Sequence, residues 1–371
     1  MSPSARPIVS AVLPAVVPAV VPHGGNLSEA VRRYGIPREQ WIDLSTGINP
    51  CGYPVPDIDA QAWLRLPDDY DDLEAIAADH YGTQRALAVA GTQAAIRMLP
   101  HVLPVGGIGI GLLTYGEYAP AFAAAGFTVE RFVTAPFADR RDSADFLLAP
   151  GVPLPATLKH LVIVNPNNPG TESFDAAALL DWHRQLRSRG GGLIVDEAFV
   201  EATPHLSVAR YVEAEGLIVL RSVGKFYGLA GARVGFALVP AALDRAMRGL
   251  RGPWTVSGPA RCVVRAALLD EPWQRMTRAR LNDASARLAA LLDRHGFEPT
   301  HTPLFAWVRC SDAAAVQDHL ARRAVWVRRF DAVSGLRFGL PAHEGAWARL
   351  DAVLCEASTD ARSDGRPRPN R

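Results

Sequence analysis

Short runs of valine, isoleucine and leucine recur along the first two thirds of the chain, and segments with helical spacing of apolar residues separate them. Each run is continuously apolar, which is typical of strands that are buried on both faces of a mostly parallel sheet. The pattern therefore predicts an α/β fold in which helices flank such a sheet. The runs lie at 86–90, 108–113, 161–164, 193–195 and 217–220.

Beyond about residue 240 the pattern changes to long amphipathic helices and short apolar runs, which predicts a smaller α+β domain. We expect helices at 273–295, 313–323 and 344–355, and strands at 305–308 and 324–327. We divide the chain into a flexible leader, an N-terminal arm, a large ligand-binding domain, a small C-terminal domain and a disordered tail. Their expected bounds are 1–22, 23–50, 51–245, 246–357 and 358–371.

Composition and charge limit the class of protein. Hydrophobic residues make up 49% of the 371 residues and charged residues 21%, as in a soluble globular protein. The net charge is +1, so no strong field favours nucleic acid or a membrane surface as a partner. Residues 8–21 are apolar, but prolines at 14, 18 and 22 interrupt them, which argues against a signal peptide.

The cysteines indicate a cytoplasmic protein that holds no metal. They lie far apart, with no CxxC pair and no histidine pattern beside them, at Cys51, Cys262, Cys310 and Cys355. This spacing fits neither a zinc site nor a disulfide framework. Reduced thiols are typical of the cytoplasm.

Polar residues follow the last three apolar runs of the large domain, at the point where each strand is expected to end. Asn168, within NPNNPG, follows the first of them, Asp196 follows the second and Lys225 follows the third. Ligands of open α/β sheets bind at the carboxyl ends of the strands. We therefore expect an amide, a carboxylate and an amine to lie together at one edge of the sheet.

These three groups are the set that pyridoxal phosphate (PLP) chemistry requires. Burial would lower the pKa of Lys225 and make its amine a nucleophile toward the aldehyde of the cofactor. Asp196 would keep the pyridine nitrogen protonated, and Asn168 would donate to the ring oxygen. Each residue alone has a plainer interpretation, as a surface lysine in a glycine-rich turn, a helix-capping aspartate or a surface turn. Together they indicate a PLP enzyme.

The chain resembles the fold type I PLP enzymes of the class I and II aminotransferase superfamily from residue 23 to about residue 355. The motifs that carry the resemblance are HGGN, IDLSTGINP, NPNNPG, DEAF, GKFYGLAGARVGF, PWTVS and LRFGLP. HGGN and the INP loop make it most similar to the threonine-phosphate decarboxylases of cobalamin biosynthesis, which are related to histidinol-phosphate aminotransferases. The resemblance implies a homodimer that decarboxylates L-threonine O-3-phosphate. Transamination of histidinol phosphate is the alternative, because the sequence does not reveal which bond at Cα stands perpendicular to the cofactor ring.

The resemblance also implies a role for each matching position in the cofactor site. Lys225 would form the Schiff base, Asp196 would pair with the pyridinium, Asn168 would donate to the ring oxygen and Tyr118 would stack on the ring face. The cofactor phosphate would be held by Gly91, Thr92, Ser222 and Arg233.

The resemblance further implies a substrate site. Arg337 would bind the α-carboxylate, and Arg328 would bind the substrate's own phosphate, with His23 and Asn26 as further candidates. A solvated strand position is the plainer interpretation of Arg328.

Three positions depart from the superfamily pattern. Gly224 replaces a hydroxyl residue that contacts the cofactor phosphate in relatives. Phe199 stands where many aminotransferases have a tyrosine, and the phenylalanine agrees with the decarboxylase relatives. Leu66 replaces a tyrosine that relatives extend to the cofactor of the partner subunit, which puts that contact in doubt but not dimerisation.

Two other classes of protein share this fold. A PLP-fold transcription regulator would need a DNA-binding domain, and the residues before His23 are too few for one. A binding module derived from such an enzyme would tolerate loss of the lysine, whereas Lys225 is present.

Overall fold

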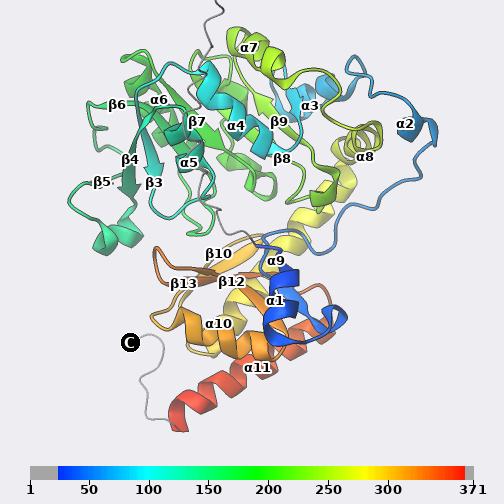
Figure 1. Ribbon diagram of the computed structural model, residues 1–371, viewed down its shortest axis with the longest axis vertical. Coiled ribbons are helices and arrows are strands. Elements are labelled where there is room, and N and C mark those ends of the chain that lie inside the picture. The colour runs from blue at the N-terminus through cyan, green and yellow to red at the C-terminus, as the bar shows by residue number, and fades with distance from the viewer. Residues whose placement is uncertain (1–23, 364–371) are drawn as a thin grey trace, which may run out of the picture.

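The computed structural model describes residues 24–363, which form a large and a small domain, the upper and lower halves of Figure 1. Two sheets organise them, one of eight strands and one of five. The predicted leader at 1–22, His23 and the end of the predicted tail lie outside the described residues. Within 24–363, none of the helices combines the length and the apolar character needed to cross a membrane.

The large sheet has the strand order β2-β9-β8-β7-β6-β3-β4-β5. All neighbours pair in parallel except β9, which is antiparallel to both β2 and β8. This confirms the predicted α/β class with a mostly parallel sheet. The strands are β2 (Leu87–Val89), β3 (Gly107–Gly111), β4 (Thr128–Val133), β5 (Phe146–Leu147), β6 (Leu158–Val164), β7 (Gly192–Asp196), β8 (Leu217–Ser222) and β9 (Gly235–Leu238).

Helices cover both faces of the large sheet, which explains why its strands are continuously apolar. In β6, Val162 and Val164 pack with one group of helices, and Leu161 and Ile163 pack with the other. The first group is α4 (Thr92–Val102), α5 (Tyr118–Ala124) and α7 (Ala241–Arg251). The second includes α3 (Leu73–Tyr81), α6 (Ala176–Arg187) and α8 (Gly258–Leu269).

The small sheet has the strand order β1-β12-β13-β11-β10. The predicted N-terminal arm is part of this small domain, because β1 pairs in parallel with β12. The strands are β1 (Ile42–Leu44), β10 (Pro299–Thr302), β11 (Phe305–Arg309), β12 (Val325–Phe330) and β13 (Gly335–Gly339). Its helices are α1 (Leu27–Tyr34), α10 (Ala313–Arg322) and α11 (Glu344–Ser363).

The chain leaves the large domain later than residue 245. Both α7 and α8 pack against helices of the large domain, and α9 (Glu271–Arg294) then runs from α8 to β10 and β11 (Figure 1). At the other end, α11 continues to Ser363, so the predicted disordered tail began too early. No glycine or proline interrupts the sequence between Ala346 and Ser363, which allows the helix to continue.

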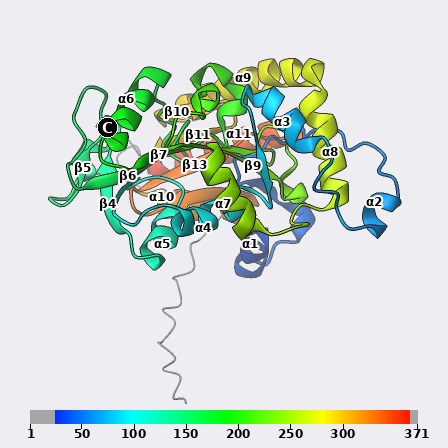
Figure 2. The same ribbon diagram turned by 90° about the horizontal axis from the view of Figure 1, so that it is seen from above.

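The remaining elements are short. The helix α2 (Gln61–Leu64) lies on a loop that extends away from the body of the large domain (Figure 2). Short 3₁₀ helices lie at Arg38–Gln40, Ala135–Arg140, Val200–Ala202, Pro204–Leu206, Ala209–Tyr211 and Ala230–Ala232.

Candidate active site

The ends of β6, β7 and β8 meet at one edge of the large sheet. Asp196, the last residue of β7, is paired with Val164 of β6 and with Leu220 of β8. The turn that carries Asn168 and the segment that carries Lys225 therefore begin on either side of Asp196. This is the arrangement that the apolar runs predicted.

Asp196 is a buried carboxylate with two hydrogen-bond donors. Its Oδ2 accepts a hydrogen bond of 2.7 Å from the Tyr118 hydroxyl, and its Oδ1 accepts one of 3.0 Å from the backbone N–H of Ala198. Burial raises its pKa, whereas these two donors and the charge of Lys225 oppose that rise. The donors hold the carboxylate in one orientation, as a partner for a pyridinium requires.

Tyr118 and Tyr115 are two aromatic residues beside Asp196 that differ in burial. The side chain of Tyr118 is fully buried, and its hydroxyl donates to Asp196. Tyr115 is the half-buried aromatic residue next to it, with a distance of 6.3 Å between the ring centroids. Burial raises the pKa of Tyr115 to about 12, and the charges of Asp196 and Arg233 also act on it. We therefore transfer the proposed stacking role from Tyr118 to Tyr115.

Lys225 is poised for nucleophilic chemistry. Burial and the nearby guanidinium of Arg337 together lower the pKa of its amine to about 8, while the charge of Asp196 opposes the shift. Among residues 24–356, no acceptor forms a hydrogen bond or ion pair with Nζ. With this lowered pKa, a larger fraction of the amine is neutral near pH 7 than in an ordinary lysine. The neutral amine is the form that attacks a carbonyl carbon.

Phe199 forms an apolar wall beside the lysine. Its ring centroid lies 5.6 Å from Lys225 Nζ and 5.2 Å from the ring centroid of Phe305 in the small domain. A Cβ atom at Gly47 would lie 3.0 Å from the ring of Phe199, so Gly47 allows this close packing. Phe199 carries no hydroxyl, and its ring contacts the small domain through Phe305.

The four residues predicted to hold the cofactor phosphate come together. Ser222 is paired with Gly235, and a Cβ atom at Gly235 would lie 2.8 Å from the backbone nitrogen of Thr92. A Cβ atom at Gly91 would lie 2.7 Å from Arg233 Nη2, and Gly91 has a φ of +73°, which favours glycine at this position. The result is a cup of backbone N–H groups at the start of α4, a hydroxyl and a guanidinium, which fits a phosphate.

Arg337 reaches from β13 of the small domain into the site. Its Nη2 donates to the carbonyl of Ser45 at 2.6 Å, and its Nη1 donates to Asn168 Oδ1. Arg337 is 6% exposed, and its Nε has no hydrogen-bond partner among the described residues. Burial and the charge of Arg328 lower the pKa of Arg337 to about 9. An anion in this site would give Nε a hydrogen-bond acceptor and would raise the pKa of Arg337 again.

Arg328 and Arg337 are neighbours across two strands. They are paired in the register of β12 and β13, so both side chains project from one face of the small sheet. Phe330 lies beside both guanidinium groups, with its ring centroid 5.2 Å from Cζ of Arg328 and 5.9 Å from Cζ of Arg337. Two cations this close suit a ligand with two anionic groups on neighbouring carbons.

The candidates in the HGGN motif have different outcomes. The side chain of Asn26 caps α1, because its Oδ1 accepts from the backbone N–H of Glu29 at 3.3 Å. This local bond orients the Asn26 amide, and its role toward the substrate stays a prediction. Gly24 lies against the site, since a Cβ atom there would be 3.3 Å from Arg337 Nη2. His23 lies outside the described residues.

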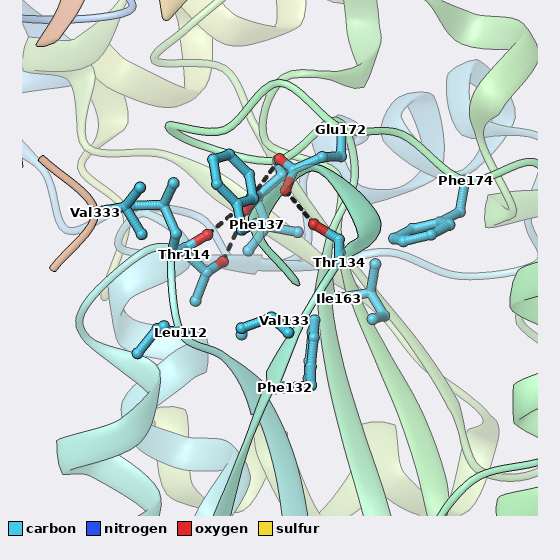
Figure 3. A pocket seen from close by; sticks show the side chains of 14 residues that line it. Leu112, Thr114, Phe132, Val133, Thr134, Phe137, Ile163, Glu172, Phe174 and Val333 are labelled. Carbon is cyan, nitrogen blue, oxygen red and sulfur yellow. Dashed lines mark hydrogen bonds between the residues drawn. The ribbon is translucent and has the colours of Figure 1, made fainter. Parts of the chain in front are cut away.

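A narrow cavity lies beside Glu172, in the segment that follows β6 (Figure 3). Glu172 accepts hydrogen bonds there from Thr134 at 2.7 Å and from Asn167 at 2.9 Å, and Thr114 donates to Asn167 at 2.9 Å. Val333 of the small domain lines the same cavity. These bonds hold the turn that carries Asn168 in place. No group of three potential metal ligands occurs in the part of the chain that the structure describes.

A buried aspartate, a lysine with a lowered pKa and a phosphate cup at the strand ends define a PLP-dependent enzyme of fold type I. A family model described as aminotransferase class I and II matches residues 59–346. The chain belongs to this family.

Relatives and solved structures of known name agree with the family. A threonine-phosphate decarboxylase of Pseudomonas aeruginosa is 48% identical over 333 residues, which cover 90% of this chain and 96% of that protein. One from a Sinorhizobium species is 40% identical over 342 residues, 90% of this chain and 97% of that protein. A solved structure of a histidinol-phosphate aminotransferase from Sinorhizobium meliloti, in complex with PLP, matches 94% of this chain and 98% of that chain. The TM-score of the match is 0.75, and the two sequences are 18% identical.

The sequence did not single out Tyr115 or Ser45 as parts of the site, nor Asn49, whose backbone N–H donates to the carbonyl of Lys225 at 3.0 Å. Tyr115 precedes a helix, and nothing in its spacing separates it from Tyr118. Ser45 acts through its backbone carbonyl, which no side-chain pattern reveals. The unusual loop 45–50 was the only signal that could have led to Asn49.

Proposed function

We propose that this protein catalyses the PLP-dependent decarboxylation of L-threonine O-3-phosphate to (R)-1-amino-2-propanol O-2-phosphate. The single observation that carries the proposal is the pair of Arg337 and Arg328 on neighbouring strands. The substrate bears its carboxylate on Cα and its phosphate on Cβ, so its two anions lie on neighbouring carbons and could each meet one of the two paired arginines. The names of the relatives with 48% and 40% identity support the same reaction.

The cofactor fits the residues that are present. Asp196 would pair with its ring nitrogen, Asn168 would donate to its ring oxygen, and Lys225 would hold its aldehyde carbon. Gly91, Thr92, Ser222 and Arg233 would bind its phosphate. When bound, PLP supplies a ring that accepts the electrons left on Cα after a bond there breaks.

The protein's own residues would determine which bond breaks. Arg337 would bind the carboxylate and Arg328 the phosphate, and these two contacts would fix the rotation of the substrate about its Cα–N bond. Phe199 and Phe305 would exclude water from the reacting carbon. Lys225 would deliver a proton from Nζ to Cα after carbon dioxide leaves.

Transamination of histidinol phosphate is the second candidate. The same lysine, aspartate and amide would serve it, and histidinol-phosphate aminotransferases are among the relatives, at 28–34% identity over shorter matches. Histidinol phosphate carries no carboxylate, so in that reaction Arg337 would meet an anionic partner only when 2-oxoglutarate is bound.

Product analysis tests the choice. The purified protein with PLP is incubated with L-threonine O-3-phosphate, and in parallel with histidinol phosphate and 2-oxoglutarate. We expect carbon dioxide from the first mixture and no glutamate from the second. Glutamate formation without release of carbon dioxide would move the assignment to the aminotransferase.

We also propose a cytoplasmic homodimer that acts in cobalamin biosynthesis. Exposed apolar side chains gather on and beside the projecting α2 loop, and a second copy of the chain would cover them. They include Trp63 at 69%, Leu66 at 68%, Tyr70 at 97% and Trp254 at 53% exposure. Light scattering tests this, because a Trp63→Glu, Leu66→Glu protein should have half the molar mass of the wild type, and an unchanged mass would contradict it.

A further inference from the structure

The segment that carries Lys225 is held in place by residues far away in sequence. Residues 223–229 follow β8 without forming a helix or strand of their own. Their backbone carbonyls must still find donors, since the segment is mostly buried. Three consecutive carbonyls, at 225, 226 and 227, accept hydrogen bonds from the segment 49–53.

Asn49 provides two of these three bonds. Its backbone N–H donates to the carbonyl of Lys225 at 3.0 Å, and its side-chain Nδ2 donates to the carbonyl of Phe226 at 2.8 Å. Tyr53 provides the third, to the carbonyl of Tyr227 at 2.8 Å. The two segments can approach this closely because residue 228 is a glycine. A Cβ atom there would lie 2.5 Å from Cα of Gly52.

The orientation of the Asn49 amide is fixed by its other partners. Its Oδ1 accepts from the backbone N–H of Cys51 at 3.0 Å and from Arg280 Nη2 at 3.1 Å. Both partners only donate in these bonds, so the oxygen must face them and Nδ2 must face Phe226. Asn49 is 3% exposed, and rotation of the amide would leave buried groups without partners.

The same stretch of chain also contacts the substrate side of the site. Four residues before Asn49, the carbonyl of Ser45 accepts a hydrogen bond from Arg337. Between them, Gly47 packs against Phe199 and Phe305. The stretch 45–49 therefore joins the guanidinium proposed for the substrate carboxylate to the backbone of the lysine.

We propose that Asn49 is a positioning residue that fixes the Lys225 amine relative to Asp196 and Arg337. The proposal rests on the proposed function only in treating Lys225 as the reactive amine. The charges of Arg337, Asp196 and Arg233 all act on that amine. A displacement of the backbone at residue 225 changes these distances and the approach to the substrate, and a displacement of about 1 Å can cost about 100-fold in rate.

A matched control separates positioning from stability. Gln274 is also a buried amide, 2% exposed, and its Nε2 donates to the carbonyls of Ala267 and Leu268 at 3.0 Å. Gln274→Ala removes side-chain bonds to buried carbonyls outside the lysine segment, whereas Asn49→Ala removes the side-chain bond to Phe226 within it and keeps the backbone bond to Lys225. Arg280→Ala is a milder test, because it removes one bond to Asn49 Oδ1 from a partly exposed side chain.

The experiment is a pH titration of the visible absorbance of the PLP-loaded variants, together with kcat and KM. For Asn49→Ala we expect the titration midpoint to move by about 0.5 unit or more and kcat to fall about 10- to 100-fold, with a KM change below about 3-fold. Arg280→Ala should give smaller changes in the same direction, and it decides the matter if Asn49→Ala does not fold. Gln274→Ala should lower Tm and leave the midpoint unchanged.

The proposal is overturned if Asn49→Ala and Arg280→Ala keep the wild-type midpoint and kcat, or if Gln274→Ala shifts both as much as they do. The titration requires no substrate, so its result does not depend on which reaction the enzyme catalyses. Failure of the proposed function would appear separately, as the absence of carbon dioxide release by the wild type.

Discussion

Arg337 of the small domain donates a hydrogen bond from Nη1 to Asn168 Oδ1 of the large domain. A guanidinium can only donate, so the oxygen of the Asn168 amide must face it and the NH₂ group must face away. No described residue accepts a hydrogen bond from that NH₂ group. Arg337, which we propose binds the substrate carboxylate, thus orients the amide of Asn168, which we propose donates to the cofactor.

Asn168→Asp should disturb both functions of this contact. The new carboxylate would form an ion pair with Arg337 and compete with the substrate carboxylate, and it could no longer donate to the ring oxygen. We expect KM for threonine phosphate to rise about 10-fold or more and kcat to fall about 10- to 100-fold. Steady-state kinetics measure this, with the exposed Asn282→Asp as the control. An unchanged KM would contradict the contact.

Tyr118→Phe should weaken cofactor binding without affecting the substrate. The hydroxyl of Tyr118 is one of two hydrogen bonds that favour the ionised form of Asp196, so its loss should raise the pKa of this carboxyl further. We expect the dissociation constant of PLP to rise about 10-fold, corresponding to one hydrogen bond to a charged group. Titration of the apoprotein with PLP measures it.

Tyr115→Phe, which keeps the ring proposed to stack, should bind PLP more tightly than Tyr115→Ala, and the reverse order would refute the transfer of that role.

The pKa of Lys225 predicts how the stability of the apoprotein depends on pH. Its value is about 8 in the folded protein, against an ordinary value of 10.5 for the unfolded chain. Between these values the unfolded chain binds a proton that the folded protein does not, so stability increases as pH rises from about 8 to about 10.5. Below about pH 8 the buried charge costs its full amount, up to roughly 3 kcal/mol.

Lys225→Met removes this cost. The variant apoprotein should be more stable than the wild type at pH 7, and the difference should disappear near pH 10.5. Urea unfolding at both pH values measures the two free energies of unfolding. A difference that is the same at pH 7 and pH 10.5 would show that the lysine does not titrate in this range.

Arg328→Gln tests the site for the substrate phosphate. We expect KM for threonine phosphate to rise about 10- to 100-fold, because a hydrogen bond to a charged group is lost. Inorganic phosphate should inhibit the wild type and should inhibit the variant much less. Arg329→Gln is the matched control, since Arg329 is the next residue on β12 and forms an ion pair with Asp331 at 2.8 Å. Equal effects of the two substitutions would exclude a specific role for Arg328.

The sequence predicted those parts of the site that follow directly from strand order. Asn168, Asp196 and Lys225 each follow a continuous apolar run, and parallel pairing brings the ends of such runs together. Gly91, Thr92, Ser222 and Arg233 were placed by motifs, and their close approach depends on glycines that the sequence displays.

The parts that the sequence did not reveal depend on contacts between distant segments. Asn49 and Phe226 are separated by 177 positions, and no periodicity connects them. Tyr115 and Tyr118 can be distinguished only after the position of Asp196 is known. The sequence placed the domain boundary at residue 245, before two helices that pack on the large domain. The amphipathic pattern of α7 and α8 does not reveal which domain they cover.

The central claim is that Lys225 is the residue on which the chemistry depends. Reduction of the PLP-loaded protein with borohydride, followed by peptide mapping, tests this most directly. We predict that the reduced cofactor is attached to Lys225 in the wild type, and that Lys225→Ala yields no modified peptide and releases no carbon dioxide from threonine phosphate. Attachment of the cofactor to another lysine, or a modified peptide from Lys225→Ala, would contradict the account.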